Sequence, residues 1–221
     1  MLPRVLEPEV MDTEEEAVAY DHMDHSEVNR SFIDRFVALG ARGRVLDVGT
    51  GPAHIPLELV RRGPGRSVVA IDAAHHMLAI GREHVARDGF ARRVRLVLTD
   101  AKRLPFPDRS FDAVMSNSIV HHLPDPLPAF REIARVLRPG GALLLRDLHR
   151  PDDVRELDRL VALHAAGADA RQRALFRDSL HAAFTTAELI ELLARAGLRD
   201  LAVSKSSDRH WTAERPARLT A

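Results

Sequence analysis

The chain alternates between short apolar runs and amphipathic segments from Arg44 to Arg146, and this alternation restricts the fold more than any other feature. Apolar runs predict five strands, at residues 45–48, 67–71, 94–99, 111–116 and 142–146. The segments between them predict helices at residues 52–62, 74–88 and 127–137. Strands that alternate with helices form parallel sheets covered on both faces. The sequence therefore predicts a doubly wound α/β domain with a mostly parallel sheet.

The two ends of the chain extend this core. After it, helices are expected at 152–166, 170–182 and 186–196, followed by strands at 198–204 and 210–213 around a turn. We expect these strands to form an antiparallel hairpin that completes a seven-stranded sheet with an antiparallel edge. Before the core, an extended segment 1–11 leads into helices at 13–23 and 26–39, for which Thr13 and Ser26 are N-cap candidates. The single domain thus divides into a helical cap (1–40), an α/β core (41–150), a helical lid (151–197) and C-terminal strands (198–221).

Composition excludes several classes of protein. The 221 residues are 45% apolar and 29% charged, which is typical of a soluble globular domain. Lys plus Arg and Asp plus Glu number 32 each, so the strong positive field of a dedicated nucleic-acid binder is lacking. The absence of cysteine excludes disulfides, thiolate metal sites and a cysteine nucleophile. Because no apolar run approaches about 20 residues and no signal core is visible, we expect a cytoplasmic protein with no membrane partner.

Acidic residues mark the ends of the first three strands. Asp47 precedes the glycine turn Gly49–Gly51, Asp72 ends the second strand, and Asp100 ends the third. The carboxyl ends of parallel strands share one edge of the sheet, where ligands bind. The turn lacks the G-x-G-x-x-G pattern of dinucleotide-binding loops, and an acid beside it suits a cationic, phosphate-free ligand. With Asp72 placed for ribose hydroxyls and Asp100 for an adenine amino group, the three acids predict one nucleoside ligand.

The chain resembles the class I S-adenosylmethionine-dependent methyltransferases, above all the ubiquinone/menaquinone-type and related small-molecule enzymes. Four blocks carry the resemblance, and they cover roughly residues 41–150: VLDVGTG, VVAID, LTDAKRLPFPDRSFDAVMSNSIVHHLPD and EIARVLRPGGALLL. It implies a Rossmann-like methyltransferase fold, with S-adenosylmethionine as cofactor and S-adenosylhomocysteine as product. One departure is Ala53, where many relatives have a third glycine. We expect cofactor binding to survive this change with a slightly altered loop.

The resemblance also implies a set of cofactor-binding residues. Asp47, Gly49, Thr50 and Gly51 would line the methionine and ribose part, with His54 in the same loop, and Asp72 would bind the ribose hydroxyls. Ala73 and Met77 would cover the adenine, and Asp100 and Ala101 would lie at its amino edge. Asn117 and Ser118 would lie beside the sulfonium. In the family an aromatic residue of the N-terminal helix often closes the pocket, and Tyr20 is the candidate here. A packing role for Tyr20 is an equal alternative.

Methyl transfer from a sulfonium is an in-line displacement, for which the protein supplies position and a dry pocket. A base is needed only if the acceptor loses a proton. The candidates are the adjacent His121 and His122, with Asn117 beside the reacting centre. On a helix the two imidazoles would point about 100° apart, so at most one faces the reaction, and His121 is preferred. The alternative is that one histidine packs or caps and the other is solvated. A histidine base predicts activity that varies between about pH 5 and 8.

Polar residues after the fifth strand and in the lid are candidates for binding the acceptor. They are His149, Arg150, Arg177, His181, Arg209 and His210. They predict a small anionic or polar acceptor, and the alternative is an ion-pair network that braces the lid. The chain has 12 histidines, but no H-E-x-x-H or similar metal spacing occurs, and we expect no metal.

The sequence thus predicts a methyltransferase for a small-molecule acceptor, active as a monomer or homodimer. The SNSI segment lacks the N-P-P-Y-type motif common in enzymes that methylate bases, so no nucleic-acid partner is expected. Two alternatives stay open. A quinone-type C-methyltransferase predicts a long apolar channel under the lid. A non-catalytic S-adenosylmethionine-binding protein predicts no space for an acceptor beside the sulfonium.

Overall fold

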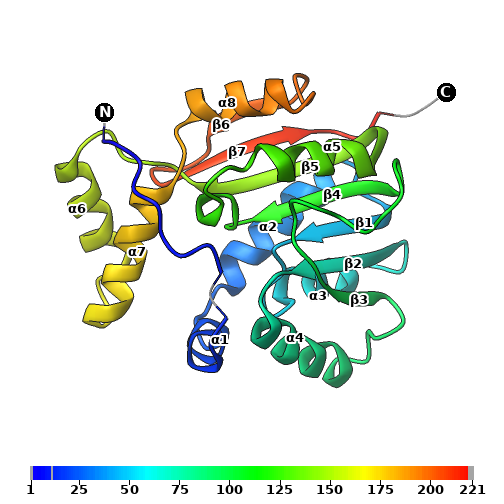
Figure 1. Cartoon of the computed structure of the whole chain (residues 1–221). Helices are drawn as coiled ribbons and strands as arrows, with labels where there is room; N and C mark the ends of the chain where they lie inside the picture. The colour runs from blue at the N-terminus through cyan, green and yellow to red at the C-terminus, as the bar shows by residue number, and fades with distance from the viewer. Residues whose placement is uncertain (1, 11, 219–221) are drawn as a thin grey trace.

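In the computed structural model, which describes residues 2–10 and 12–218, seven strands form one sheet in the order β3-β2-β1-β4-β5-β7-β6 (Figure 1). They are β1 (Gly43–Val48), β2 (Arg66–Asp72), β3 (Val94–Leu98), β4 (Phe111–Asn117), β5 (Leu137–Leu148), β6 (Ala202–Lys205) and β7 (His210–Arg215). Strands β1 to β5 pair in parallel, and β7 runs antiparallel to both β5 and β6. The predicted doubly wound, mostly parallel seven-stranded sheet is confirmed.

Helices cover both faces of the sheet, and two further helices lie beyond the carboxyl ends of its central strands. They are α1 (Glu14–Asp21), α2 (Ser26–Ala38), α3 (His54–Arg61), α4 (His75–Arg87), the short 3₁₀ helix η1 (Val120–His122), α5 (Leu127–Val136), α6 (Val154–His164), α7 (Ala170–Ala182) and α8 (Thr186–Arg195). Helices α5 and α8 lie on one face, and α2, α3 and α4 lie on the other (Figure 1). Helices α6 and α7 stand beyond the carboxyl ends of the central strands. Among the described residues, none of the helices combines the length and the apolar character needed to cross a lipid bilayer.

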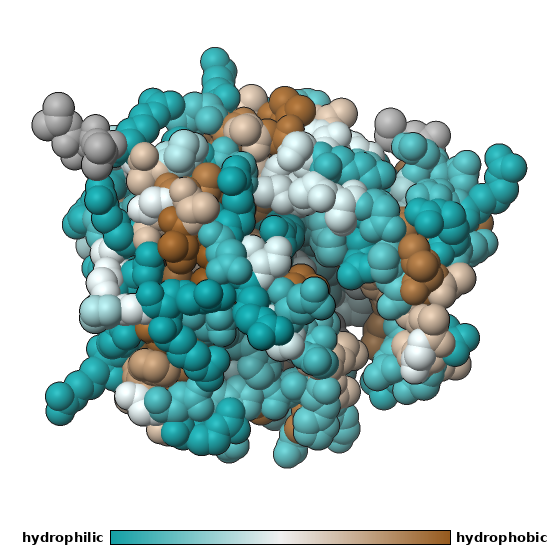
Figure 2. Space-filling view, turned by 180° about the vertical axis from the view of Figure 1, so that it is seen from behind, coloured by the Kyte–Doolittle hydropathy of each residue, from teal (hydrophilic) through white to brown (hydrophobic). Residues whose placement is uncertain are grey.

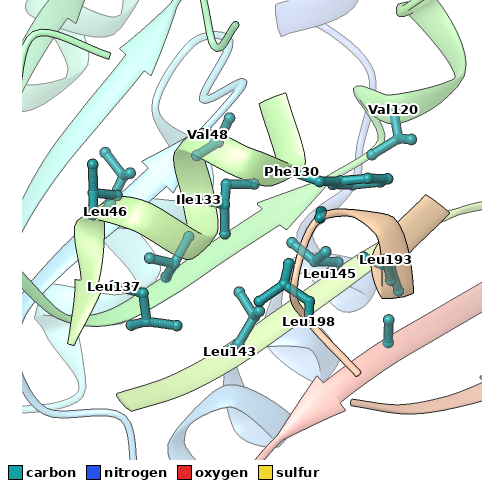
Figure 3. Close-up of a cluster of buried hydrophobic side chains, with 14 of the residues drawn as sticks. Leu46, Val48, Val120, Phe130, Ile133, Leu137, Leu143, Leu145, Leu193 and Leu198 are labelled. Carbon is teal, nitrogen blue, oxygen red and sulfur yellow. The ribbon is translucent and has the colours of Figure 1, made fainter. Parts of the chain in front are cut away.

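The two-faced core follows from the period of two along each strand. On β1, Leu46 and Val48 join the buried cluster beneath α5 and α8, where Phe130 and Leu193 also lie (Figure 3). Val45 packs on the opposite face with α2, α3 and α4. Because both faces are covered, the central strands can be apolar throughout, and this explains why they stand out in the sequence.

The predicted antiparallel hairpin completes one end of the sheet, with β7 between β5 and β6. One expectation is wrong in detail. Strand β5 begins earlier than expected, at Leu137, and passes through Pro139-Gly140-Gly141 with a register irregularity. A side chain at Gly141 would place its Cβ 2.5 Å from Leu137 Cδ1 and 2.7 Å from the Asp112 carbonyl oxygen. The glycine therefore allows close strand contact where the sequence suggested a break.

The helix caps follow the sequence in one case and depart from it in another. Thr13 forms the predicted capping box with Glu16, and each backbone N–H donates to the other's side chain at 3.2 Å. Ser26 is not the N-cap of α2. His25 holds that position, and the Ser26 N–H donates to the Asp24 carboxylate at 2.9 Å.

The extended N-terminal segment, residues 2–10, fastens the lid to the core. Leu2 is buried in the leucine cluster between α6 and α7. The Arg4 guanidinium donates to the carbonyl oxygens of His121, Leu123, Pro124 and Ala182 at 2.6–3.0 Å. Seen from behind, a notch separates the lid helices from the body of the molecule (Figure 2). The segment thus connects α7 with the loop that follows β4.

Candidate functional site

A cavity of about 340 Å³ lies at the carboxyl edge of the sheet, where β1, β2 and β4 end. All the predicted cofactor residues except Asp47 line it: Tyr20, Gly49, Thr50, Gly51, His54, Asp72, Ala73, Met77, Asp100, Ala101, Asn117 and Ser118. They come from separate parts of the chain, and the parallel strand ends bring them to one place. Asp47 lies behind the wall of the cavity and is buried.

The loop between β1 and α3 can take its shape only with little side-chain bulk. Gly49 has φ +76°, and a Cβ there would lie 1.9 Å from Ile119 Cγ2. Gly51 has φ +53°, and its N–H donates to Asp72 Oδ2 at 2.7 Å. Ala53, where the family resemblance suggested a third glycine, also adopts a left-handed conformation with φ +66°. That conformation costs an alanine about 1–2 kcal/mol, so the loop keeps its glycine-type turn at some expense in stability.

Two acids beside the cavity hold their protons unusually tightly. Burial raises the pKa of Asp47 to about 7, with a further rise from nearby Asp72, and the Asp47 Oδ2 atom has no hydrogen-bond partner. Burial also raises the pKa of Asp72, although its carboxylate accepts from the Gly51 and Ala74 N–H groups. A cation or a set of hydroxyl donors in the cavity would stabilise both carboxylates. The electrostatics therefore favour a cationic ligand rich in donors.

Tyr20 closes the cavity on the side of α1. A Cβ built on Gly51 would lie 3.8 Å from Tyr20 Cε1, and the Tyr20 ring lies 5.3 Å from the His25 ring. Burial raises the pKa of the Tyr20 hydroxyl, and the negative charge of Asp72 adds to the effect. Tyr20 is therefore a wall of the site, the position expected of a closing aromatic residue.

The two adjacent histidines of η1 occupy different environments. His122 lines the cavity, whereas His121 is buried behind it and its Nδ1 pairs with the Asp147 carboxylate. The carboxylate of Glu7 lies between the two imidazoles, with Oε1 3.4 Å from His121 Nε2 and 3.1 Å from His122 Nδ1. The position of His121 therefore does not support the preference for it as the residue facing the reaction.

The pKa values of His121 and His122 also shift in opposite directions. Burial lowers the pKa of His121, but Asp147 and Glu7 outweigh that effect and the net pKa is raised. Burial and the nearby charge of His121 lower the pKa of His122 to about 4. Burial raises the pKa of Glu7, against the pull of His121. The cluster thus favours the protonated form of His121, beside the Asp147 carboxylate, and a neutral imidazole at His122.

Sequence reasoning missed the part of the site that comes from the N-terminal segment. Glu9 and Val10 line the cavity, and Glu9 pairs with Lys102 on the opposite wall. Glu7 reaches the two histidines and accepts from the Ser179 hydroxyl at 3.0 Å. The segment has no periodicity or motif, so nothing in the sequence marked these acids as site residues.

The six residues predicted to bind the acceptor lie outside the cavity wall: His149, Arg150, Arg177, His181, Arg209 and His210. Two of them brace the structure. Arg150 is buried, donates to the Ala183 carbonyl oxygen at 2.9 Å and pairs with Glu188. Arg177 pairs with Asp158 across the two lid helices.

The other four lie near the β5–β7 end. The His149 N–H donates to the Arg209 carbonyl oxygen at 2.8 Å, and His210 Nδ1 lies 2.9 Å from the Ser207 hydroxyl. His149 Nδ1 and His181 Nε2 are buried and have no hydrogen-bond partner among the residues that the structure describes. By contrast, the contacts of Arg150 and Arg177 given above favour an ion-pair network that braces the lid over a role in binding the acceptor.

The family match in the comparisons with known proteins covers the part of the chain that supplies most of the cavity wall. Residues 46–145 match a family model described as a methyltransferase domain. A ubiquinone/menaquinone biosynthesis C-methyltransferase of Geobacter sulfurreducens is 34% identical over 110 residues, covering 49% of this chain and 43% of that protein. A demethylmenaquinone methyltransferase of Thermus thermophilus is 41% identical over 108 residues, covering 49% and 48%. This chain thus spans about half the length of these curated relatives.

A solved structure extends the likeness in fold to nearly the whole chain. An S-adenosylmethionine-dependent methyltransferase from Aquifex aeolicus superposes with a TM-score of 0.68 at 19% identity. The match covers 94% of this chain and 100% of that one. The lid and the C-terminal hairpin are therefore part of an architecture that the two structures share.

Proposed function

We propose that the chain is a class I S-adenosylmethionine-dependent methyltransferase, because its residues 46–145 match the model of a methyltransferase domain, and that it transfers a methyl group from S-adenosylmethionine to a small-molecule acceptor. The observation that carries the proposal is the cavity. Its wall joins a glycine loop, a buried carboxylate at Asp72 and the Asn117–Ser118 pair in one space. The cofactor, when bound, supplies a methyl group activated by a positively charged sulfur.

The wall residues divide the work of holding this cofactor. Asp72 already accepts two backbone N–H groups, and a carboxylate has about four acceptor positions, so it can also accept from both ribose hydroxyls. Ala73 and Met77 supply apolar surface for the adenine, and Asp100 supplies an acceptor for its amino group. Tyr20 excludes water from the side of α1.

On the acceptor side, we assign the base to His122. Its Nδ1 faces the Glu7 carboxylate, so a proton on Nδ1 leaves the Nε2 lone pair free to take a proton from an acceptor hydroxyl or amine. Glu7 would then stabilise the imidazolium that forms. His121 and Asp147 hold this cluster in place from behind, and Asn117 lies on the cavity wall beside the expected sulfonium position.

Replacing His122 with alanine is expected to lower kcat about a hundredfold and leave cofactor affinity within a few-fold of wild type, since base catalysis is worth that much. Because the pKa of His122 is about 4 rather than near its ordinary value, kcat at saturating cofactor should not vary between pH 5 and 8, as the sequence suggested for a histidine base, but stay level from pH 8 to about 5 and fall toward pH 4. Steady-state kinetics across that pH range, with Glu7→Gln as an intermediate case, provide the check. An unchanged kcat in the alanine variant would remove His122 from the reaction.

Replacing Asp47 with asparagine is expected to remove a pH dependence of cofactor binding. In the wild type, a cation must bind the ionised carboxylate, so affinity should drop by up to about tenfold per unit below pH 7. Calorimetric titration with S-adenosylmethionine at pH 5.5, 6.5 and 8 tests this.

The stability of the same variant serves as its control. The raised pKa of Asp47 means that its ionisation opposes folding as the pH rises toward 7, so the variant should be at least as stable as wild type at pH 8. If Asp47→Asn binds S-adenosylmethionine weakly but its affinity depends on pH as that of the wild type does, another group controls the pH dependence of binding.

The quinone-type alternative rests on the two curated relatives, which match about half of this chain. The space between α6 and α7 is filled by the chain's own apolar residues, among them Leu2, Leu157 and Leu160. That packing favours a small acceptor over one with a long apolar tail. The decisive assay measures transfer of labelled methyl to demethylmenaquinone against a panel of small phenols, amines and acids. Transfer to the quinone alone would establish the alternative, and no transfer with tight cofactor binding would indicate a non-catalytic binder.

We retain from the sequence the proposals of a cytoplasmic location and a monomer or homodimer. The four-part division into cap, core, lid and C-terminal strands is likewise a proposal. It is supported by the position of α6 and α7 beyond the strand ends (Figure 1).

A further inference from the structure

A second cluster of chemically active side chains lies where α1, α3 and α4 meet. Asp21 ends α1, His54 begins α3 and His84 lies near the end of α4. His54 Nε2 is 2.8 Å from Asp21 Oδ1, and His84 Nε2 is 3.3 Å from Asp21 Oδ2. The three ligand atoms all lie within 4.8 Å of one another. We propose that Asp21, His54 and His84 bind one divalent transition-metal ion, and that zinc suits this donor set.

The tautomer of His84 is fixed by its surroundings. His84 Nδ1 lies 3.0 Å from the Pro52 carbonyl oxygen, which can only accept, so Nδ1 carries a proton. The Nε2 lone pair then faces the Asp21 carboxylate, and two acceptors face each other inside a buried contact. A cation between them, either a second proton or a metal ion, is needed to make that contact favourable. Metal-binding histidines commonly donate their other ring N–H to a backbone carbonyl in this way.

The other two residues also fit the role of ligands. Asp21 Oδ1 is buried, and His54 Nε2 lies 2.8 Å from it. Metal–ligand bonds of about 2.0–2.2 Å place ligands roughly 3.4 Å apart in a tetrahedron, so the observed separations require only a small outward movement.

The site has room for further ligands and a route to solvent. Asp21 and His54 line a second cavity of about 250 Å³, and His54 also borders the cofactor cavity. Two imidazoles, one carboxylate and an open position form a set that zinc accepts. Because Tyr20 directly precedes Asp21, a bound ion would fasten α1 to the helix that follows the glycine loop. It would thereby hold Tyr20 over the cofactor cavity.

Calorimetric titration of zinc chloride into untagged, chelator-treated protein tests the proposal. We expect one ion per chain, with affinity weakened at least tenfold in His54→Gln, His84→Gln and Asp21→Asn variants. His76→Gln is the matched control. His76 lies on the same helix α4 and pairs with Asp12, but no third ligand joins this exposed pair within residues 2–10 and 12–218. The control should bind zinc as the wild type does.

Thermal unfolding gives a second readout that does not depend on methyl transfer. A hundredfold excess of zinc over its dissociation constant should raise the wild-type Tm by roughly 5 °C or more and leave His54→Gln unchanged. His54 is partly exposed, so this variant remains informative if His84→Gln fails to fold.

Three outcomes would overturn the proposal. Zinc affinity equal to wild type in His54→Gln is one. Loss of zinc binding in Glu7→Gln alone is another, because Glu7, His121 and His122 also bring three ligand atoms within 4.8 Å of one another. The third is the absence of both heat and a Tm shift in the wild type, which would show that only a proton lies between His84 and Asp21.

Discussion

Replacing Asp72 with alanine is expected to weaken the binding of S-adenosylmethionine roughly a hundredfold or more. Asp72 has two tasks in the proposed complex. It anchors the glycine loop through the Gly51 and Ala74 N–H groups at 2.7 and 2.9 Å, and it accepts from the ribose hydroxyls. Hydrogen bonds to a charged acceptor contribute about 1.5–3 kcal/mol each, and each 1.4 kcal/mol changes affinity about tenfold. Loss of two such bonds accounts for the expected effect before any disorder of the loop is counted.

Calorimetry with S-adenosylmethionine and S-adenosylhomocysteine measures this effect directly. The Asp72→Asn variant separates the tasks, because an amide oxygen can still accept from the loop but carries no charge. Asp34→Ala is the control for loss of an acid, since Asp34 is exposed and pairs only with Arg62 at the surface. Affinities of Asp72→Ala within threefold of wild type would contradict the assignment of the cavity to this cofactor.

Replacing Asp147 with asparagine is expected to reduce the free energy of unfolding by about 3–5 kcal/mol, because it leaves a buried charge without its partner. Asp147 is fully buried and accepts from the N–H groups of His121 and Leu148 as well as from the His121 ring. An amide cannot neutralise the imidazolium. The Tm should fall by roughly 10 °C for a chain of this size.

A double variant, Asp147→Asn with His121→Gln, tests the origin of that loss. If the unpaired charge is responsible, the double variant should recover part of the stability lost in the single one. A single variant within about 1 kcal/mol of wild type would show that the pair is not a main contributor.

The same pair predicts a pH dependence of stability. The folded pKa of His121 is raised, so its contribution is complete below about pH 6.5 and is lost as the pH rises through the folded pKa. The pKa of Asp147 is lowered despite its burial, because His121 outweighs that effect, so its contribution is complete above about pH 4 and is lost at lower pH. The difference in unfolding free energy between wild type and Asp147→Asn should therefore be largest between about pH 4 and 6.5. Denaturant titrations at pH 3, 5 and 9 measure it.

The sequence identified the cofactor side of the site because its residues are tied to strand ends. Asp72 and Asp100 follow apolar runs that could be recognised locally, and in a parallel sheet such ends necessarily converge. Gly49 and Gly51 were equally visible, since a positive φ demands glycine there. Residues far apart in the sequence could be assigned to one site wherever the predicted sheet topology brings the ends of their strands together.

The acceptor side depends on contacts that no local pattern encodes. Helical geometry shows that His121 and His122 diverge but not which of them faces the cavity. Successive residues of β5 point to opposite faces of the sheet, so Arg146 packs over Phe32 on α2 while Asp147 faces η1. Asp147 pairs with His121 there, which leaves His122 to face the cavity. Glu7 and Arg4 could not be placed at all, since an irregular segment has no period from which its position can be inferred.

The docking of the N-terminal segment also has a consequence for the order of events during synthesis. Arg4 binds carbonyl groups that lie 117 to 178 residues further along the chain. The segment 2–10 is therefore synthesised before its partners in the loop after β4 and in α7, and long-range contacts of this kind form slowly. The cofactor cavity can take shape while the chain is still growing, whereas Arg4 can bind Ala182 and Glu7 can accept from Ser179 only after α7 has been made. The segment 2–10 would then be among the last parts to dock, although it precedes the core in the chain.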